Sequence, residues 1–157
     1  MLETYDLERF VRAQSPVFDG VCSELRAGRK TGHWMWFIFP QVSGLGHSDM
    51  SRAFAIHSRR EALAFLNHPV LGPRLYGCTG IVNNLDTVDV RDIFGDIDAM
   101  KFRSCMTLFS LVASGVEAGK QPFIIALQKY FGGKPDQRTI NLLKGESPVL
   151  PFGSRIS

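Results

Sequence analysis

Apolar residues recur along most of the 157-residue chain at the spacing of three or four positions that is typical of amphipathic helices. The spacing is clearest over residues 70–85 and over the stretch from about Asp98 to Ser114, which we expect to form the most buried helix. No run of alternating residues finds an obvious pairing partner, so no strand is predicted. The sequence therefore predicts an all-α protein with a single compact multi-helix domain of about seven or eight helical segments. We assign the domain to residues 1–145 and an irregular tail to residues 146–157, where three Pro or Gly residues oppose helix formation.

Polar and helix-breaking residues mark the expected ends of these helices. Ser58 is a suitable N-terminal cap for a helix that runs to residue 67, and Asp136 is one for the last helix. Ser15-Pro16 has the composition of a helix start, with Ser at the cap and Pro at the first position. Gly95 should close one short helical turn before the long helix begins.

One stretch, residues 33–41, departs from the helical pattern. It contains both tryptophans, and residues 34–39 carry neither a charge nor a polar side chain. Fully burying each of these large residues would contribute roughly 1.5–3 kcal/mol, so we expect the segment at the centre of the packing. Pro40 ends any helix there, and Gly44 and Gly46 favour an irregular loop. The segment is thus either a short helical turn or a buried extended strand-like piece that leads into that loop.

Groups that can bind a ligand gather on both sides of this aromatic block. Trp34 and Trp36 could form the wall of a pocket, and buried indole N–H groups need partners. The polar candidates for ligand binding are His33, Gln41, His47, Ser48 and Asp49. The other interpretation is a hydrophobic anchor followed by a surface turn, and the sequence leaves both open.

Charged residues fall on the apolar faces of two predicted helices. Asp98 and Lys101 are three positions apart in the first turn of the long helix, where they could pair with each other. They are either a capped and paired helix end or the floor of a cleft. Arg74 lies within the apolar face of residues 70–85, either as a stem with a solvated head or as a buried partner for an anion.

Composition limits the possible partners. The net charge of +3 is too small for a nucleic-acid footprint, and the densest basic cluster, Arg26, Arg29 and Lys30, is interpreted as a solvated helix end or an anion site. No apolar run is long enough to cross a membrane. Three cysteines in no Cys-x-x-Cys pair favour a reducing compartment, so we expect a cytoplasmic protein without disulfides.

Common catalytic and cofactor motifs are not found. The sequence has no glycine-rich nucleotide loop, no nucleophile elbow and no His spacing for a metal, so we predict neither a cofactor nor a metal ion. If the protein is an enzyme, its catalytic residues should be His33, Asp98 and Lys101, because a His or Asp near an apolar wall can act as a general base.

Four segments resemble a known family. They are residues 7–14, residues 24–30, the His-Trp-Met-Trp-Phe-Ile-Phe-Pro-Gln block at 33–41, and Asp98-Ala-Met-Lys-Phe at 98–102. Together they resemble the family catalogued as domain of unknown function 1810, over roughly residues 5–143. The resemblance implies a single, mainly helical domain and no defined activity. Some members carry the label calpastatin, but calpastatin-like inhibitors are largely disordered, whereas this chain is rich in large apolar residues. The combination of aromatic walls with Asp, Lys and Trp is also similar in plan to N-glycosidases that act on ribosyl compounds.

Two functional hypotheses follow. The first is a cleft for a small nucleotide- or ribosyl-like ligand, with hydrolysis of an N-glycosidic bond as its enzymatic form. The second is a non-catalytic module that uses the aromatic block to bind a partner protein or a second copy of the chain. The sequence leaves the oligomeric state open.

Overall fold

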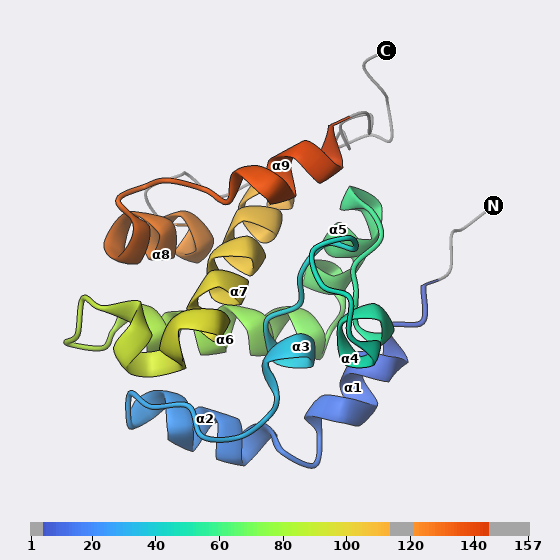
Figure 1. Cartoon of the computed structure of the whole chain (residues 1–157). Helices are drawn as coiled ribbons and strands as arrows, with labels where there is room; N and C mark the ends of the chain where they lie inside the picture. The colour runs from blue at the N-terminus through green and yellow to red at the C-terminus, as the bar shows by residue number, and fades with distance from the viewer. Residues whose placement is uncertain (1–4, 114–120, 145–157) are drawn as a thin grey trace.

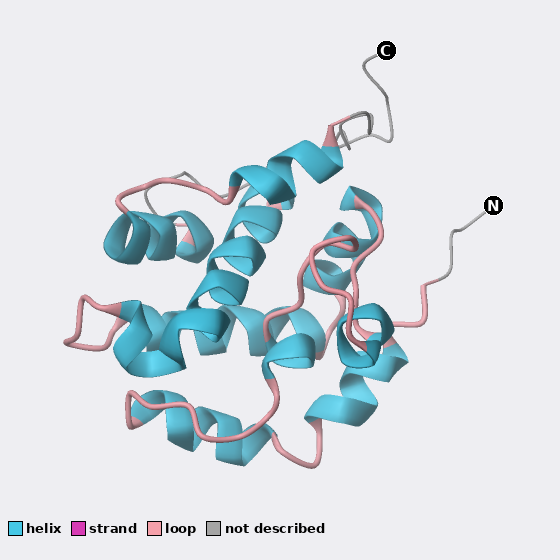
Figure 2. Cartoon of the chain, in the orientation of Figure 1, coloured by secondary structure: helices cyan, strands magenta, loops and turns pink. Residues whose placement is uncertain are grey.

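The computed structural model describes residues 5–113 and 121–144, and within these ranges the chain is helical. Figures 1 and 2 show helices joined by loops. Among the described residues the only β-type pairing is an isolated bridge between Val42 and Ile56. The prediction of an all-α protein is confirmed, with nine helices in the described residues. The tail assigned to residues 146–157 and the expected helix end at Ser114 lie outside these residues. The helices are α1 (Glu8–Gln14), α2 (Phe18–Arg26), α3 (Met35–Ile38), α4 (Asp49–Ala53), α5 (Arg59–Asn67), α6 (Leu71–Asn83), α7 (Val90–Val112), α8 (Pro122–Phe131) and α9 (Gln137–Leu143).

Helix α7 is the longest element, and the others are arranged around it and α6 (Figure 1). It packs against α5, α8 and α9, while α6 packs against α2, α5 and α8. Buried apolar residues from these helices form one continuous cluster. The short helix α3 contacts α1 and contributes the aromatic segment to this cluster.

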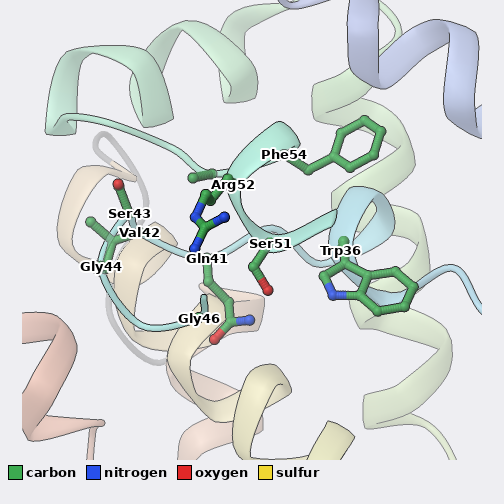
Figure 3. A pocket seen from close by; sticks show the side chains of 10 residues that line it. Trp36, Gln41, Val42, Ser43, Gly44, Gly46, Ser51, Arg52 and Phe54 are labelled. Carbon is green, nitrogen blue, oxygen red and sulfur yellow. The ribbon is translucent and has the colours of Figure 1, made fainter. Parts of the chain in front are cut away.

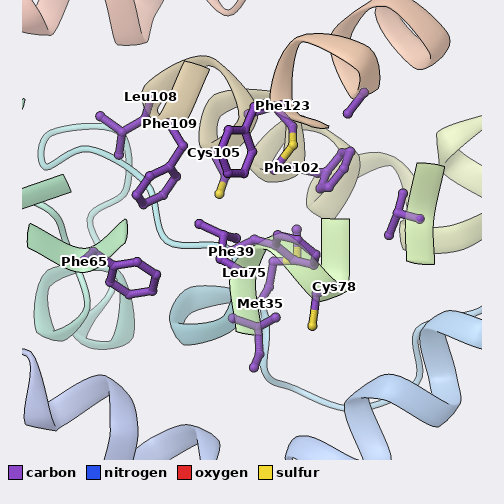
Figure 4. Packing of buried hydrophobic residues seen from close by; sticks show 14 of the residues in the cluster. Met35, Phe39, Phe65, Leu75, Cys78, Phe102, Cys105, Leu108, Phe109 and Phe123 are labelled. Carbon is purple, nitrogen blue, oxygen red and sulfur yellow. The ribbon is translucent and has the colours of Figure 1, made fainter. Parts of the chain in front are cut away.

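The aromatic segment lies at the centre of the core, as its composition predicted. Phe39 is fully buried and its ring meets that of Phe102 on α7 edge to face, with centroids 5.1 Å apart (Figure 4). Phe109, further along α7, packs against Phe65 of α5 at 5.4 Å. Such aromatic pairs each contribute about 0.5–1.5 kcal/mol beyond the area that they bury. Of the two conformations left open for this segment, the structure shows the helical turn.

The two predicted helix caps, Ser58 and Asp136, are confirmed, and Ser48 caps α4 in the same way. The side chains of Ser48, Ser58 and Asp136 each accept a hydrogen bond from the backbone N–H of the residue three positions later. The predicted start at Ser15-Pro16 is wrong. The backbone N–H of Ser15 donates to Val11 O at 3.0 Å, so Ser15 closes α1, and α2 begins at Phe18. A polar residue between two helices can end the first or begin the second, and here Ser15 ends α1.

The expected boundary at Gly95 is confirmed, because the element labelled α7 consists of two helical stretches that meet at a kink at this residue. Gly95 has φ of 78° and ψ of 173°, a conformation that residues with a Cβ atom avoid. The chain continues in helical form on both sides of it. After the break, Asp96 and Ile97 are exposed, and Asp98 lies against Lys30 in the segment that precedes α3.

Two hydroxyl side chains of α7, those of Ser104 and Thr107, are buried against the start of α9. Ser104 donates to Oδ2 of Asp136 at 2.9 Å, and the backbone N–H of Asp136 donates to Oγ1 of Thr107 at 2.8 Å. These bonds satisfy the polar groups that burial would otherwise leave unpaired. The second half of α7 is therefore buried at these two hydroxyl side chains as well as on its apolar face.

Candidate functional site

A groove opens where the break in α7 faces the segment that leads into α3. Its volume is about 510 Å³, within the range of small-ligand pockets. One wall comes from residues 94–98 and Lys101 of α7, and the other from the segment before and within α3. That second wall consists of Lys30, His33, Met35 and Trp36.

Asp98 lies between two lysines in this groove. Its Oδ2 is 2.8 Å from Nζ of Lys30, and its Oδ1 is 3.3 Å from Nζ of Lys101. The three side chains are mostly shielded, with 9%, 18% and 23% of the surface exposed for Lys30, Asp98 and Lys101. Asp98 and Lys101 both line the cleft. The ion pair that the sequence predicted is therefore present, although Asp98 does not cap the helix, whose N-cap is Asp89.

Each lysine also stands over an indole ring. Nζ of Lys30 is 5.1 Å from the ring centroid of Trp34, and Nζ of Lys101 is 5.0 Å from that of Trp36. An ammonium group within about 6 Å of an aromatic face is attracted to it. The two indole rings and the two ammonium groups are therefore packed together beside the Asp98 carboxylate.

Glu24 of α2 orders the segment that carries Lys30 and Trp34. Its Oε1 accepts hydrogen bonds from the backbone N–H groups of Thr31 and Gly32, at 2.6 and 2.8 Å, and from the indole N–H of Trp34 at 3.1 Å. Partial burial raises the pKa of Glu24, but these hydrogen bonds outweigh that effect and leave the pKa below its ordinary value. Trp34, a predicted ligand-binding residue, is thereby held in the core with only 3% of its surface exposed, and it does not line the groove.

Helix α3 is held from its other side by Gln14. The buried amide of Gln14 donates to the carbonyl of Phe37 at 2.8 Å, and its Oε1 accepts from Arg74 at 3.3 Å. The Arg74 guanidinium also stacks over Phe18 at 4.8 Å. Arg74, a predicted ligand-binding residue, therefore lies at the α1–α2 junction and does not line the groove.

A small recess adjoins the groove at Trp36, which lines both (Figure 3). Its volume of about 30 Å³ is that of roughly one water molecule. Polar side chains of Gln41, Ser51 and Arg52 line the recess. Gln41 was predicted as a ligand-binding residue, whereas Ser51 and Arg52 were not recognised from the sequence.

The remaining candidates of the loop after Pro40 lie outside both cavities. His47, Ser48 and Asp49 are exposed, and none of them lines the groove or the recess. Ser48 caps α4, and Asp49 approaches Arg52 at 3.6 Å. The loop is anchored near its start, because Val42 is 5% exposed and pairs with Ile56.

The structure thus gathers four predicted residues, His33, Trp36, Asp98 and Lys101, around one groove. It adds Lys30, which the sequence placed in a solvated helix end. That assignment is wrong, because the Lys30 side chain is 9% exposed and points to Asp98. In the sequence, Lys30 follows the helix-ending Gly28 and lies in a polar turn, which suggests a surface position. Only the contact with Asp98 of α7 shows that the Lys30 side chain is shielded.

Within the described residues, no group of three His, Cys, Asp or Glu side chains is placed to hold a metal ion. None of the described helices combines the length and the apolar character that a membrane crossing requires.

The described chain is thus an all-α protein in which a groove with charged and aromatic walls lies beside the kink in α7. The chain belongs to the family described as "Protein of unknown function (DUF1810)", whose model matches residues 4–143. The expected family is thereby confirmed. The chain is also similar to a solved structure, that of the conserved hypothetical protein Rv1873 from Mycobacterium tuberculosis. The two are 48% identical, with a TM-score of 0.86 over 92% of this chain and 100% of that one. A search of curated proteins finds no match.

Proposed function

We propose that the groove beside the break in α7 binds a small nucleotide-like ligand. The observation that carries this proposal is the Asp98 carboxylate held between two ammonium groups next to the half-exposed ring of Trp36. An indole face can stack on a planar base, and Lys30 and Lys101 supply positive charge for a phosphate or similar anion. A cluster of ionisable groups in a cleft with an aromatic wall is typical of a ligand site.

The enzymatic form of the proposal is hydrolysis of an N-glycosidic bond. The bond between C1′ of the sugar and the base nitrogen would break, and the oxygen of a water molecule would bond to C1′. One proton of that water is lost, and the leaving nitrogen takes up one proton. Asp98 would stabilise the positive charge that develops on the sugar, as carboxylates do in glycoside hydrolysis.

Two further residues would carry protons in this reaction. Lys101 lies 3.3 Å from Asp98 and could donate a proton to the leaving base. His33 is exposed at the rim of the same groove, where it could accept the proton of the attacking water. Trp36 would hold the base against the wall while the bond breaks.

Binding and turnover need separate measurements. Titration of the full chain with AMP, NAD and ADP-ribose, followed by tryptophan fluorescence, tests binding. Chromatography of free base released from the same compounds tests hydrolysis. We expect Asp98→Asn to abolish base release while Trp36→Leu weakens binding by about tenfold, the loss of one stacking contact. Arg138→Met serves as a control, because Arg138 is exposed on α9, away from the groove.

The two parts of the proposal fail differently. If none of the compounds changes the fluorescence or the melting temperature, the groove is not a nucleotide site. If they bind and no base is released, the binding role remains and the hydrolytic role is refuted.

A second candidate, the interaction module or homodimer, is favoured by one observation. Ile97 and Met100, on the turn of α7 next to Asp98, are 73% and 62% exposed. Large apolar side chains exposed together can mark a protein-binding surface. Size-exclusion chromatography with light scattering separates the cases: a dimer that Ile97→Asp converts to a monomer would support this candidate.

We also propose a cytoplasmic location. All three cysteines, Cys22, Cys78 and Cys105, are free thiols, which is typical of proteins from a reducing compartment.

A further inference from the structure

A second groove lies on the other side of the first turns of α7, against the end of α8. Its volume is about 630 Å³, and Asp96 is the residue that it shares with the first groove. We propose that this second groove binds a small amphipathic carboxylate, with Arg103 as the residue that receives the carboxylate group. The proposal does not depend on the function assigned to the first groove.

The walls of the second groove are largely apolar. Phe131 and Tyr130 of α8 form one side, and Met100 of α7 forms part of the other. Val88, which precedes α7, contributes to the same lining, and 73% of its surface is exposed. Met100 is 62% exposed. A ligand with an apolar body would shield both side chains from water, at a gain of about 25 cal/mol for each Å² covered.

Arg103 brings an uncompensated positive charge to this apolar groove. Its Nε donates to the carbonyl of Lys134 at 3.0 Å, and its guanidinium lies 5.5 Å from the ring centroid of Phe131. These contacts orient the side chain without neutralising it. No ion pair within residues 5–113 and 121–144 includes Arg103, whereas the other arginine of the groove, Arg91, is paired through two nitrogens with Asp89.

The remaining charges of the second groove determine at which end the carboxylate of the ligand would bind. Arg91 faces the carboxylate of Asp89, which holds the pKa of Arg91 above its ordinary value, and Asp96 acts in the same sense. Two carboxylates and one guanidinium leave that part of the groove net negative, so it repels an anion. The only positive charge in the groove without a carboxylate partner in the described chain is that of Arg103.

These features select the chemical class of the ligand. A guanidinium presents parallel N–H donors that match the two oxygens of a carboxylate. The volume suits a molecule of small drug-like size, and the apolar walls suit an alkyl or aryl body. A monocarboxylate with such a body satisfies all three conditions.

The test uses octanoate and phenylacetate as probes, with octanamide and phenylacetamide as uncharged partners of the same shape. Isothermal titration of the full chain gives affinities, and backbone amide NMR locates the binding. We expect each acid to bind, each amide to bind roughly ten- to hundredfold more weakly, and shifts confined to residues 88–91, 99–103 and 130–131. In Arg103→Met the acid should bind as weakly as the amide, while Arg138→Met should behave as the unaltered chain.

A second variant tests the same proposal in case Arg103→Met does not fold. Val88→Asp, at an exposed position, adds a negative charge to the groove and should weaken octanoate binding without changing the melting temperature. The proposal is overturned if neither acid binds, if acid and amide bind equally, if Arg103→Met keeps the full preference for the acid, or if the shifts fall on the first groove.

Discussion

Nζ of Lys30 lies 2.8 Å from Oδ2 of Asp98, although the two residues come from separate elements and only 9% of the Lys30 side chain is exposed. The pair joins the segment before α3 to the first turn after the break in α7. A backbone hydrogen bond from Lys30 N to Ile93 O, also 2.8 Å, reinforces the junction. The same contact therefore supports the fold and shapes the floor of the first groove.

We predict that Lys30 and Asp98 are energetically coupled. Lys30→Met and Asp98→Asn should each lower the free energy of unfolding by about 1–3 kcal/mol, because each leaves a shielded partner short of a charged hydrogen bond. The double variant should cost less than the two single effects together. Urea denaturation measures all three. Lys101→Met is the matched control, since the more exposed Lys101–Asp98 pair should contribute only about 0–1 kcal/mol. Strictly additive single effects would contradict the coupling.

The two tryptophans should respond differently to substitution. Trp34 is buried and donates to Glu24, so Trp34→Phe should cost about 1–3 kcal/mol in unfolding free energy. Trp36 is half-buried at the groove, and Trp36→Phe should change stability by less than about 1 kcal/mol. Acrylamide quenching provides a second readout: the fluorescence of Trp34→Phe, which reports Trp36, should be quenched readily. Fluorescence that is equally shielded in both variants would be inconsistent with the groove.

The hydrogen bonds to Glu24 predict a pH dependence of stability. Its pKa is lowered in the folded chain, so the unfolded chain takes up a proton more readily as the pH falls. The stabilisation is therefore complete above the unfolded pKa of about 4.3 and is lost as the pH falls through the lower folded value. Glu24→Gln keeps an acceptor oxygen but not the charge. The melting temperature of the unaltered chain should exceed that of Glu24→Gln at neutral pH, and the gap should close in acid. A gap that widens in acid would reverse the assigned sign.

Helix α6 offers a paired test of packing. A Cβ atom on Gly72 would lie 2.0 Å from the carbonyl oxygen of Leu66, so Gly72→Ala must displace the backbone between α5 and α6. A Cβ atom on Gly77, in the same helix, meets nothing within 4 Å. We expect Gly72→Ala to destabilise the fold by about 2 kcal/mol or more and Gly77→Ala to stabilise it by roughly 0.5–1 kcal/mol. Thermal unfolding of the two variants measures these effects. Similar changes in stability at both positions would contradict the close approach of Gly72 to the Leu66 carbonyl.

The three thiols should differ in reactivity. Burial raises the pKa of Cys78 to about 12, with Cys22 beside it adding to the effect, and burial also raises the pKa of Cys105 well above its usual range. Thiols of this kind are poor nucleophiles near neutral pH. In the folded chain we expect iodoacetamide to modify only Cys22, which is half-buried, and to modify all three after unfolding in urea. Mass spectrometry of peptides identifies the sites, and rapid modification of Cys105 in the folded chain would be inconsistent with its burial.

Local patterns in the sequence were enough to predict the helices and most of their ends. Helix periodicity depends on neighbours three or four positions apart, and caps such as Ser58 and Asp136 bond within one turn. The error at Ser15 arose where two helices compete for one residue. The Asp98–Lys101 pair was predictable for the same reason, because both residues lie on one turn of α7.

The surroundings of the site depended on contacts between distant parts of the chain. No local pattern tells that Lys30 turns inward to Asp98, that Glu24 binds the Trp34 indole, or that Arg103 stands without a carboxylate partner in the described chain. Such relationships depend on which helix faces meet, and burial then selects among side chains that look alike in sequence. Helical character was therefore readable from short-range spacing, whereas the grooves exist only because the broken helix α7 meets the segment before α3 on one side and the end of α8 on the other.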